Sequence, residues 1–251
     1  MVSRSASVAP PRISIVIPCK DEAGNLPTLI DETGKALAAQ AFEVIVINDG
    51  STDETPSVLV ELAKKWHWLR VIQHSFSCGQ SAAVRTGLLA ARGEIVATID
   101  GDGQNNPIYL PQLVAALDAD ETLGLVAGQR RQRTDSRLKR MASRFANRLR
   151  GFLLKDETTD SGCGLKALRR NVFLLLPYFD GWHRYLPALV LREGFGVAHV
   201  DVVDRKRQYG ASKYGILDRG LVGILDLLGV WWLRRRRKRI PETMEIEIHG
   251  R

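Results

Sequence analysis

Two carboxylates stand two positions apart, at Asp100 and Asp102, directly after the apolar run Ile95–Ile99. Glycines flank Asp102, and they favour a tight turn that brings both side chains to one place. Carboxylate oxygens are the ligands that hard divalent cations such as Mg²⁺ and Mn²⁺ prefer, and the bound cation keeps open positions for diphosphate oxygens. A solvated acidic turn has the same composition, so this segment alone leaves a metal site and an ordinary turn as alternatives.

Acidic residues also follow two earlier apolar runs. Asn48, Asp49 and Asp53 follow the run Val44–Ile47, and Pro18, Cys19, Lys20, Asp21 and Glu22 follow the run Ile13–Ile17. The carboxyl ends of neighbouring parallel strands meet at one edge of a sheet, so we expect these segments to converge on one crevice. Asp49 suits a hydrogen bond to a base or ribose, and Asp53 suits a helix cap. No GxGxxG fingerprint follows the first run, which disfavours a dinucleotide-binding fold.

Apolar runs and helical stretches alternate along the first half of the chain. The runs, each predicted as a strand buried on both faces, are Ile13–Ile17, Val44–Ile47, Val71–Gln73, Ile95–Ile99 and Leu123–Ala127. Helical spacing of apolar residues marks Leu26–Leu37, Thr55–Lys65, Ala82–Ala91 and Leu110–Leu117. This order predicts an α/β fold with right-handed crossovers and a doubly wound, mostly parallel sheet flanked by helices.

Composition and charge narrow the class of protein. The 251 residues are 45% hydrophobic and 25% charged, which suits one large α/β domain or two small ones and excludes a disordered chain. A net charge of +8 indicates a polyanionic partner: nucleic acid, an anionic membrane or a phosphorylated substrate. The cysteines Cys19, Cys78 and Cys163 lack zinc-ligand spacing and are odd in number, so we expect a reducing cytoplasm. Residues 1–11 contain no apolar stretch of signal-peptide length.

The strand-end motifs together resemble those of family 2 inverting glycosyltransferases with the GT-A fold. The matching segments are Ile15–Pro18 with Glu22, Asn48–Asp53, and Asp100–Gln104. Two later segments, Asp160–Gly164 followed by Lys166, and Arg207–Lys213, resemble the acceptor- and phosphate-binding stretches of dolichyl-phosphate mannose synthases and bacterial polyprenyl-phosphate glycosyltransferases. The resemblance therefore implies an enzyme that transfers a sugar from a GDP- or UDP-sugar to a polyprenyl phosphate.

The resemblance also implies roles for individual residues. Asp100, Asp102 and Gln104 would bind Mg²⁺ or Mn²⁺ and the diphosphate, and Pro18, Glu22 and Asp49 would line the nucleotide pocket. Arg130, Arg207 and Lys213 would hold phosphate oxygens of the donor or the acceptor, and Arg144 is a further candidate. Cys19, Lys20 and Asp21 stand where many relatives have Tyr-Asn, and Asn48 stands where some have Asp. These departures lie at the base-binding end and leave the base and the sugar open.

The implied reaction is an in-line displacement that inverts the anomeric carbon. A phosphate acceptor is already anionic, so it needs positioning by basic groups and no general base. The alternative is transfer to a sugar hydroxyl in polysaccharide or lipopolysaccharide assembly, for which Asp160 is the candidate base. His183 lies beside Trp182 and Tyr185, which favours a structural role over the alternative of a contact with the acceptor. A nucleic-acid partner is not expected, because no recognised binding module accompanies the basic residues.

The last part of the chain predicts a helix at a membrane surface. Helical spacing over 216–233 places nine large apolar residues on one half of the helix: Ile216, Leu217, Leu221, Ile224, Leu225, Leu227, Leu228, Trp231 and Trp232. Six basic residues follow this segment at 234–239. Such a helix suits the inner face of the cytoplasmic membrane as a peripheral anchor to anionic lipid, although an ordinary packing helix is the alternative. We therefore expect a tail over 1–11, a GT-A catalytic domain over 12–213, the interface helix and basic run over 214–240, and a tail over 241–251.

Overall fold

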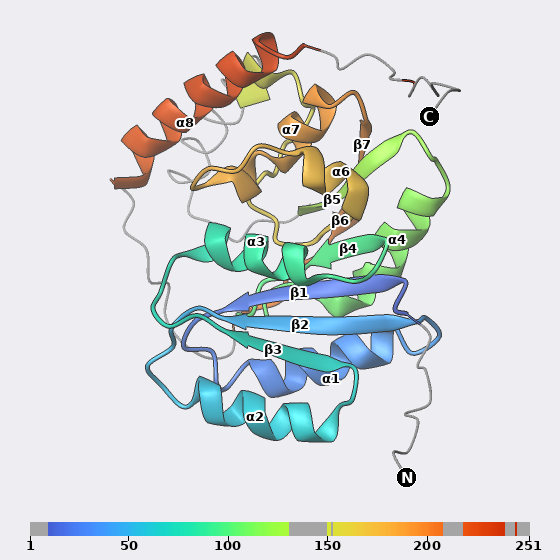
Figure 1. Ribbon diagram of the computed structural model, residues 1–251, viewed down its shortest axis with the longest axis vertical. Coiled ribbons are helices and arrows are strands. Elements are labelled where there is room, and N and C mark those ends of the chain that lie inside the picture. The colour runs from blue at the N-terminus through green and yellow to red at the C-terminus, as the bar shows by residue number, and fades with distance from the viewer. Residues whose placement is uncertain (1–9, 131–149, 152, 208–217, 239–243, 245–251) are drawn as a thin grey trace, which may run out of the picture.

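The computed structural model describes residues 10–130, 150–151, 153–207, 218–238 and 244, and its centre is a seven-stranded sheet (Figure 1). The strands are β1 (Ile13–Cys19), β2 (Phe42–Asn48), β3 (Leu69–Gln73), β4 (Ile95–Thr98), β5 (Leu123–Arg130), β6 (Lys166–Arg169) and β7 (Gly196–Val202). The helices are α1 (Leu26–Ala36), α2 (Thr55–Lys65), α3 (Gln80–Ala90), α4 (Leu110–Asp118), α6 (Arg170–Leu175), α7 (Leu186–Arg192) and α8 (Asp218–Arg235). Two short 3-10 turns are η1 (Pro107–Tyr109) and η2 (Trp182–Arg184).

The strand order β3-β2-β1-β4-β6-β5-β7 confirms the predicted doubly wound, mostly parallel sheet. β1 pairs in parallel with both β2 and β4, and β2 pairs in parallel with β3. The chain therefore places β2 and β3 on one side of β1 in the sheet and later places β4 on the other side of β1. Ligands of such sheets bind at the carboxyl ends of the strands where the order reverses, which here is the gap between β1 and β4. β6 is the exception in direction, because it is antiparallel to β4 and β5.

Both faces of the sheet are covered, which explains the continuous apolar runs of the strands. Alternate strand residues point to opposite faces, so Ile15 and Ile17 pack in one buried cluster while Val16 packs in the other. The first cluster includes α1, α2 and α4, and the second includes α3, α6, α7 and part of α8. In Figure 1, α1 and α2 lie on one side of β1–β3 and α3 lies on the other.

Helix α8 corrects the prediction of a single apolar face. Leu227 and Val230 are buried in the second cluster, where α8 packs against α7. Another set remains exposed, at Ile224 (52%), Leu225 (70%), Leu228 (48%) and Trp232 (54%). The apolar surface of α8 is therefore divided: one side packs against the rest of the protein, and the other side is exposed. Among the described residues, no helix is both long and apolar enough to cross a membrane.

Candidate active site

The Asp100 carboxylate lies just beyond β4, and the described part of the protein gives it few hydrogen-bond donors. Within the described chain, its one hydrogen bond comes from Gln80 Nε2 at the start of α3, at 2.8 Å. The Asp100 backbone N–H donates to Asn105 Oδ1 at 3.3 Å, which holds the turn. Burial and the neighbouring Asp102 carboxylate raise the pKa of Asp100 to about 6. Two adjacent carboxylates with few donors suit a site that a cation completes.

Asp102 and Gln104 share the turn that follows Asp100. The Gln104 backbone N–H donates to Asp102 Oδ1 at 3.1 Å, and the Gln104 carbonyl accepts a hydrogen bond from Arg205 N at 2.7 Å. Arg207 Nη1 lies 4.0 Å from Asp102 Oδ2. This segment is therefore fixed through its backbone, while the Asp102 carboxylate lies near a guanidinium.

Contacts between β1 and β4 bring the predicted pocket residues together. The Pro18 carbonyl accepts a hydrogen bond from Gly101 N at 3.3 Å. Glu22 is 8% exposed, and its oxygens accept from Arg207 Nη2 at 2.5 Å and from Asn25 Nδ2 at 2.6 Å. Arg207 thus links Glu22, just after β1, to Asp102 in the turn after β4. The role of each residue toward a nucleotide remains a prediction, and Lys213 and Arg144 lie outside the described residues.

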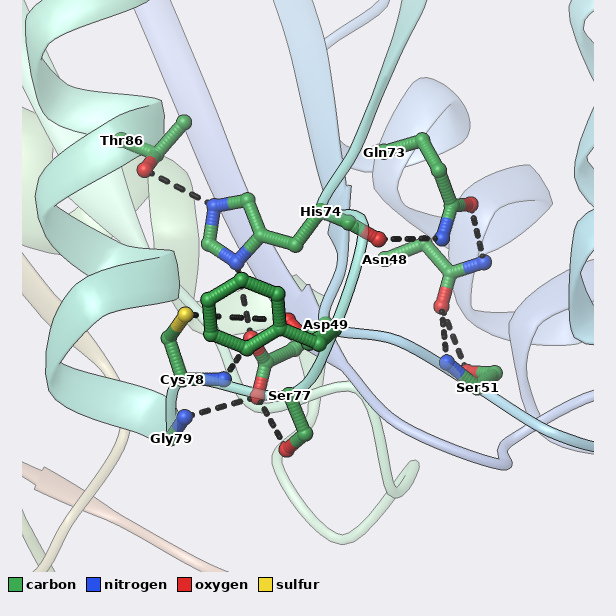
Figure 2. Close-up of polar contacts among 10 residues, drawn as sticks. Asn48, Asp49, Ser51, Gln73, His74, Ser77, Cys78, Gly79 and Thr86 are labelled. Carbon is green, nitrogen blue, oxygen red and sulfur yellow. Dashed lines mark hydrogen bonds and ion pairs between the residues drawn. The ribbon is translucent and has the colours of Figure 1, made fainter.

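Asp49, at the end of β2, differs from Asp100 because the protein itself saturates it (Figure 2). Its carboxylate accepts four hydrogen bonds from the described chain: His74 Nδ1 at 2.7 Å, Ser77 Oγ at 2.8 Å, Cys78 N at 2.9 Å and Gly79 N at 2.8 Å. Burial alone would raise the pKa of Asp49, but these donors lower it below its ordinary value. A carboxylate offers about four acceptor positions, so in this conformation Asp49 clamps the loop 74–79 onto the sheet.

Two neighbours complete this clamp. His74 Nε2 lies 2.9 Å from Thr86 Oγ1 on α3, so both ring nitrogens of His74 are engaged. Asp49, His74 and Cys78 place possible metal-ligand atoms within 4.8 Å of one another, but the donors on Asp49 already occupy its oxygens. We therefore interpret this cluster as a loop support. Its contact to a base or ribose, which the sequence predicts, remains a prediction.

Asp53 accepts a hydrogen bond at the start of α2, in keeping with the predicted capping role. The N-cap residue of α2 is Glu54, whose side chain makes no cap hydrogen bond. Asp53 Oδ1 instead accepts a hydrogen bond from Thr55 N at 3.0 Å. Asp53 Oδ2 also accepts from Ala23 N at 3.5 Å, which connects the turn after β1 with the turn after β2.

Arg130 ends β5 and joins two carboxylates that the sequence did not connect. Its Nε and Nη2 donate to Asp160 at 2.5 and 2.8 Å, and its Nη1 donates to Asp204 at 3.1 Å. The Asp160 hydrogen bonds hold the pKa of the Arg130 guanidinium well above its ordinary range. Asp204 in turn accepts from Asn105 Nδ2 at 3.0 Å, next to Asp100. Hydrogen bonds through Asp204 and Asn105 thus connect Arg130 with the turn that contains Asp100.

A cavity of about 290 Å³ opens beside Asp100. Its lining comes from the start of α3, the loop before β6, β6 itself, η2 and the first residue of α7. Gln80, Asp100, Lys166, His183 and Arg184 supply its polar side chains. His183, for which the sequence leaves an acceptor contact and a structural role as alternatives, thus lines a cavity beside Asp100 although η2 is distant from Asp100 in sequence.

Comparisons with known proteins identify the family. The sequence model described as glycosyl transferase family 2 matches residues 14–175. A dodecaprenyl-phosphate galacturonate synthase of Rhizobium johnstonii is 33% identical over 233 residues, which cover 90% of this chain and 68% of that protein. An undecaprenyl-phosphate 4-deoxy-4-formamido-L-arabinose transferase of Proteus mirabilis is 32% identical over 210 residues, covering 82% of this chain and 64% of that protein. The chain therefore spans about two thirds of the length of these relatives.

Solved structures support the fold. The glucosyl-3-phosphoglycerate synthase of Mycobacterium tuberculosis, in complex with Mn²⁺, UDP-glucose and phosphoglyceric acid, superposes with a TM-score of 0.68 at 24% identity. The match covers 93% of this chain and 81% of that one. The GT-A architecture expected from the strand-end motifs is thus confirmed.

Proposed function

Because the chain belongs to glycosyl transferase family 2 and is a glycosyltransferase, we propose that it transfers a sugar from a GDP- or UDP-sugar to a polyprenyl phosphate. The observation that carries this proposal is the carboxylate pair Asp100 and Asp102 at the reversal of strand order, next to Arg207 and Arg130. The names of both curated relatives include a polyprenyl phosphate. The acceptor and the nucleotide donor are parts of the proposal.

The acidic turn fits a resident divalent cation. The Asp100 carboxylate has one hydrogen-bond donor in the described structure and a raised pKa, so the protein leaves its negative charge poorly compensated. Asp100, Asp102 and Gln104 offer the oxygen donors that Mg²⁺ or Mn²⁺ prefers. When bound, the cation would neutralise charge on the diphosphate leaving group. Arg207, held by Glu22 beside Asp102, would orient diphosphate oxygens from the other side.

A phosphate acceptor fits this site better than a hydroxyl acceptor does. Its anionic oxygen can attack without losing a proton, so the protein needs to supply only positive charge and position. The carboxylate expected to act as base for a hydroxyl, Asp160, forms a two-point ion pair with Arg130. That pairing fixes both Asp160 oxygens toward Arg130 and so disfavours the alternative.

The exposed face of α8 supports a location at an anionic membrane surface. Ile224, Leu225, Leu228 and Trp232 form this outward face, and Arg235, Arg236 and Lys238 are exposed at its end. Arg236 lies over the Trp232 ring at 5.8 Å, which joins the apolar and basic parts. We expect salt-sensitive sedimentation with anionic vesicles, reduced by Trp232→Glu. Equal sedimentation of neutral and anionic vesicles, or none at low salt, would contradict this part of the proposal.

The test of the reaction is transfer of labelled sugar into an organic phase. Purified protein would be incubated with Mg²⁺ or Mn²⁺, a panel of UDP- and GDP-sugars and a short polyprenyl phosphate. We expect label from one donor in the wild type and in Asp120→Ala, an exposed aspartate just before β5, and none in Asp102→Ala. Retained transfer in Asp102→Ala would refute the metal assignment. Failure with every donor, despite sugar-nucleotide binding, would favour the hydroxyl acceptor.

A further inference from the structure

Helix α8 contacts the segment that walls the cavity beside Asp100. Tyr185, which directly follows η2, is 7% exposed, and its Oη donates to the Gly223 carbonyl of α8 at 3.2 Å. One turn further along α8, Asp226 lies against Gly181, where a Cβ would come within 2.9 Å of Asp226 Oδ2. These two contacts lie on either side of η2 in the sequence, and η2 forms part of the cavity wall.

The same segment is tied to the Asp100 carboxylate through the start of α3. The Gly181 N–H donates to Ser81 Oγ at 2.8 Å, and Trp182 Nε1 donates to the Ser81 carbonyl at 3.2 Å. Ser81 is 1% exposed and follows Gln80, whose Nε2 donates to Asp100 Oδ1 at 2.8 Å. A continuous chain of contacts therefore leads from α8 through η2 and α3 to the candidate cation site.

A second set of contacts passes through Arg150. Its Nη2 donates to Asp156 Oδ2 at 2.5 Å and to the Arg184 carbonyl at 3.4 Å, and its Cζ lies 5.8 Å from the centre of the Tyr185 ring. Burial raises the pKa of Asp156, and the charges of Arg150 and of Arg234 on α8 oppose this rise. Loss of one partner of a buried ion pair leaves an uncompensated charge, so this pair holds the wall firmly beside the end of α8.

Helix α8 is held on its inner side and open on its outer side. Among its side chains that the structure describes, Leu227 and Val230 are the buried ones. Its end is fixed to α7, because Arg192 Nε donates to the Leu233 carbonyl at 3.1 Å. The outward face is exposed, and the basic residues at its end complement an anionic surface. A bilayer bound to that face would restrain the helix from its outer side.

We propose that α8 couples membrane contact to the active site: an anionic bilayer on its outward face restrains the segment 181–185 and so fixes the cavity wall beside Asp100. The proposal rests on the proposed function, because it gives a regulatory role to the membrane surface named there. Simple anchoring would bring the enzyme to a membrane-bound acceptor and leave the wall unchanged. Coupling between two sites is reciprocal, so a ligand that the fixed wall binds better also strengthens membrane binding by the same factor.

The experiment is hydrogen–deuterium exchange of the wild type with and without vesicles of phosphatidylcholine and anionic phosphatidylglycerol. Amides of 181–185 report on the wall directly, because Arg184 N donates to the Gly181 carbonyl at 3.1 Å and Tyr185 N to the Trp182 carbonyl at 2.8 Å. We expect vesicles to slow exchange about fivefold or more in α8 and in 181–185, and to leave α2 unchanged. Protection confined to α8, or no vesicle effect on either segment, overturns the coupling.

Two variants test whether the observed contacts carry the effect. Tyr185→Phe removes the hydrogen bond to Gly223 with little change in volume, and Tyr178→Phe, at a tyrosine that is 44% exposed in the preceding loop, is the matched control. Gly181→Ala places a Cβ against Asp226 at a φ of +82°. We expect both Tyr185→Phe and Gly181→Ala to bind vesicles and to lose most of the protection of 181–185. Wild-type protection in both variants, with thermal unfolding verifying that each is folded, overturns the coupling path.

Kinetics with a short, water-soluble isoprenyl phosphate show whether the coupling changes the reaction. Such an acceptor is not concentrated on the vesicles, and uncharged phosphatidylcholine vesicles control for its partition. Acceptor-free anionic vesicles should raise kcat/KM of the wild type and of Tyr178→Phe about fivefold, and that of Tyr185→Phe by much less. A wild-type rate that the vesicles leave unchanged overturns the effect on catalysis. If no donor is turned over at all, the proposed function is wrong, and the exchange measurement, which uses no substrate, decides the coupling by itself.

Discussion

The carboxyl ends of β2 and β4 each carry a buried-strand aspartate followed by glycine, but the two side chains lie in opposite environments. Asp49 accepts four hydrogen bonds from the loop 74–79 and has a lowered pKa, whereas Asp100 accepts one from Gln80 and has a pKa raised to about 6. The first carboxylate is stabilised by hydrogen bonds from its own protein, and at the second the effects of burial and Asp102 outweigh the nearby positive charges. The number of donors around each acid, and not the local sequence, therefore separates a structural support from a candidate cation site.

The largest expected effect comes from removing the charge of Asp100. Asp100→Asn should lower sugar transfer by at least about 1,000-fold, because a cation-binding oxygen at the leaving diphosphate is lost. It should also abolish the rise in Tm that Mn²⁺ produces in the wild type, which reports binding independently of activity. The fold should survive, since the variant removes a poorly compensated buried carboxylate. A normal Mn²⁺-dependent rise in Tm in this variant would contradict the assignment.

The same substitution at Asp49 should act on stability. Asp49→Asn removes charged hydrogen bonds and should lower the free energy of unfolding by about 2–4 kcal/mol at pH 7, measured by urea denaturation. Because the folded pKa of Asp49 is below its unfolded value of 3.8, this stabilisation is present above pH 3.8 and is lost as the pH falls through the folded pKa. The difference between wild type and variant should therefore shrink below pH 3.8. A variant of normal stability with weakened nucleotide binding would instead make Asp49 a nucleotide contact.

Substitution of two glycines tests how closely the neighbouring loop must approach each aspartate. We expect these substitutions to have the smallest effects on Mn²⁺ binding and stability. A Cβ at Gly164 would lie 2.4 Å from Asp100 Cγ, so Gly164→Ala should displace Asp100 and weaken Mn²⁺ binding about tenfold. A Cβ at Gly50 would lie 2.5 Å from Ser77 N at a φ of +63°, so Gly50→Ala should lower stability and leave Mn²⁺ binding unchanged. Gly229→Ala, with open space around its Cβ, is the control for both. Calorimetric titration with Mn²⁺ and urea denaturation distinguish the two outcomes, and a reversal of the pattern would refute the comparison.

Much of the fold could be predicted because the relevant signals are local. The runs Ile13–Ile17 and Val44–Ile47 are continuously apolar since both faces of their strands are buried. The structure extends the first run to Cys19 and the second to Phe42 at its start and Asn48 at its end. The Thr55–Lys65 helix has the predicted bounds. The convergence of the strand ends also followed from the order of elements, because parallel strands with crossover helices must place their carboxyl ends at one edge.

The sequence by itself determined the α/β class, the order of strands and helices over the first half of the chain, and the presence of acidic residues at neighbouring strand ends, because periodicity and turn composition depend on residues close together in the chain. Only the tertiary structure decided which acid is satisfied, how Arg130 pairs with Asp160, and that His183 and Arg184 face Asp100. It also decided that α8 divides its apolar surface between the protein body and the exterior. These properties depend on donors, charges and packing partners that lie far apart in sequence, and no local pattern records which of them meet.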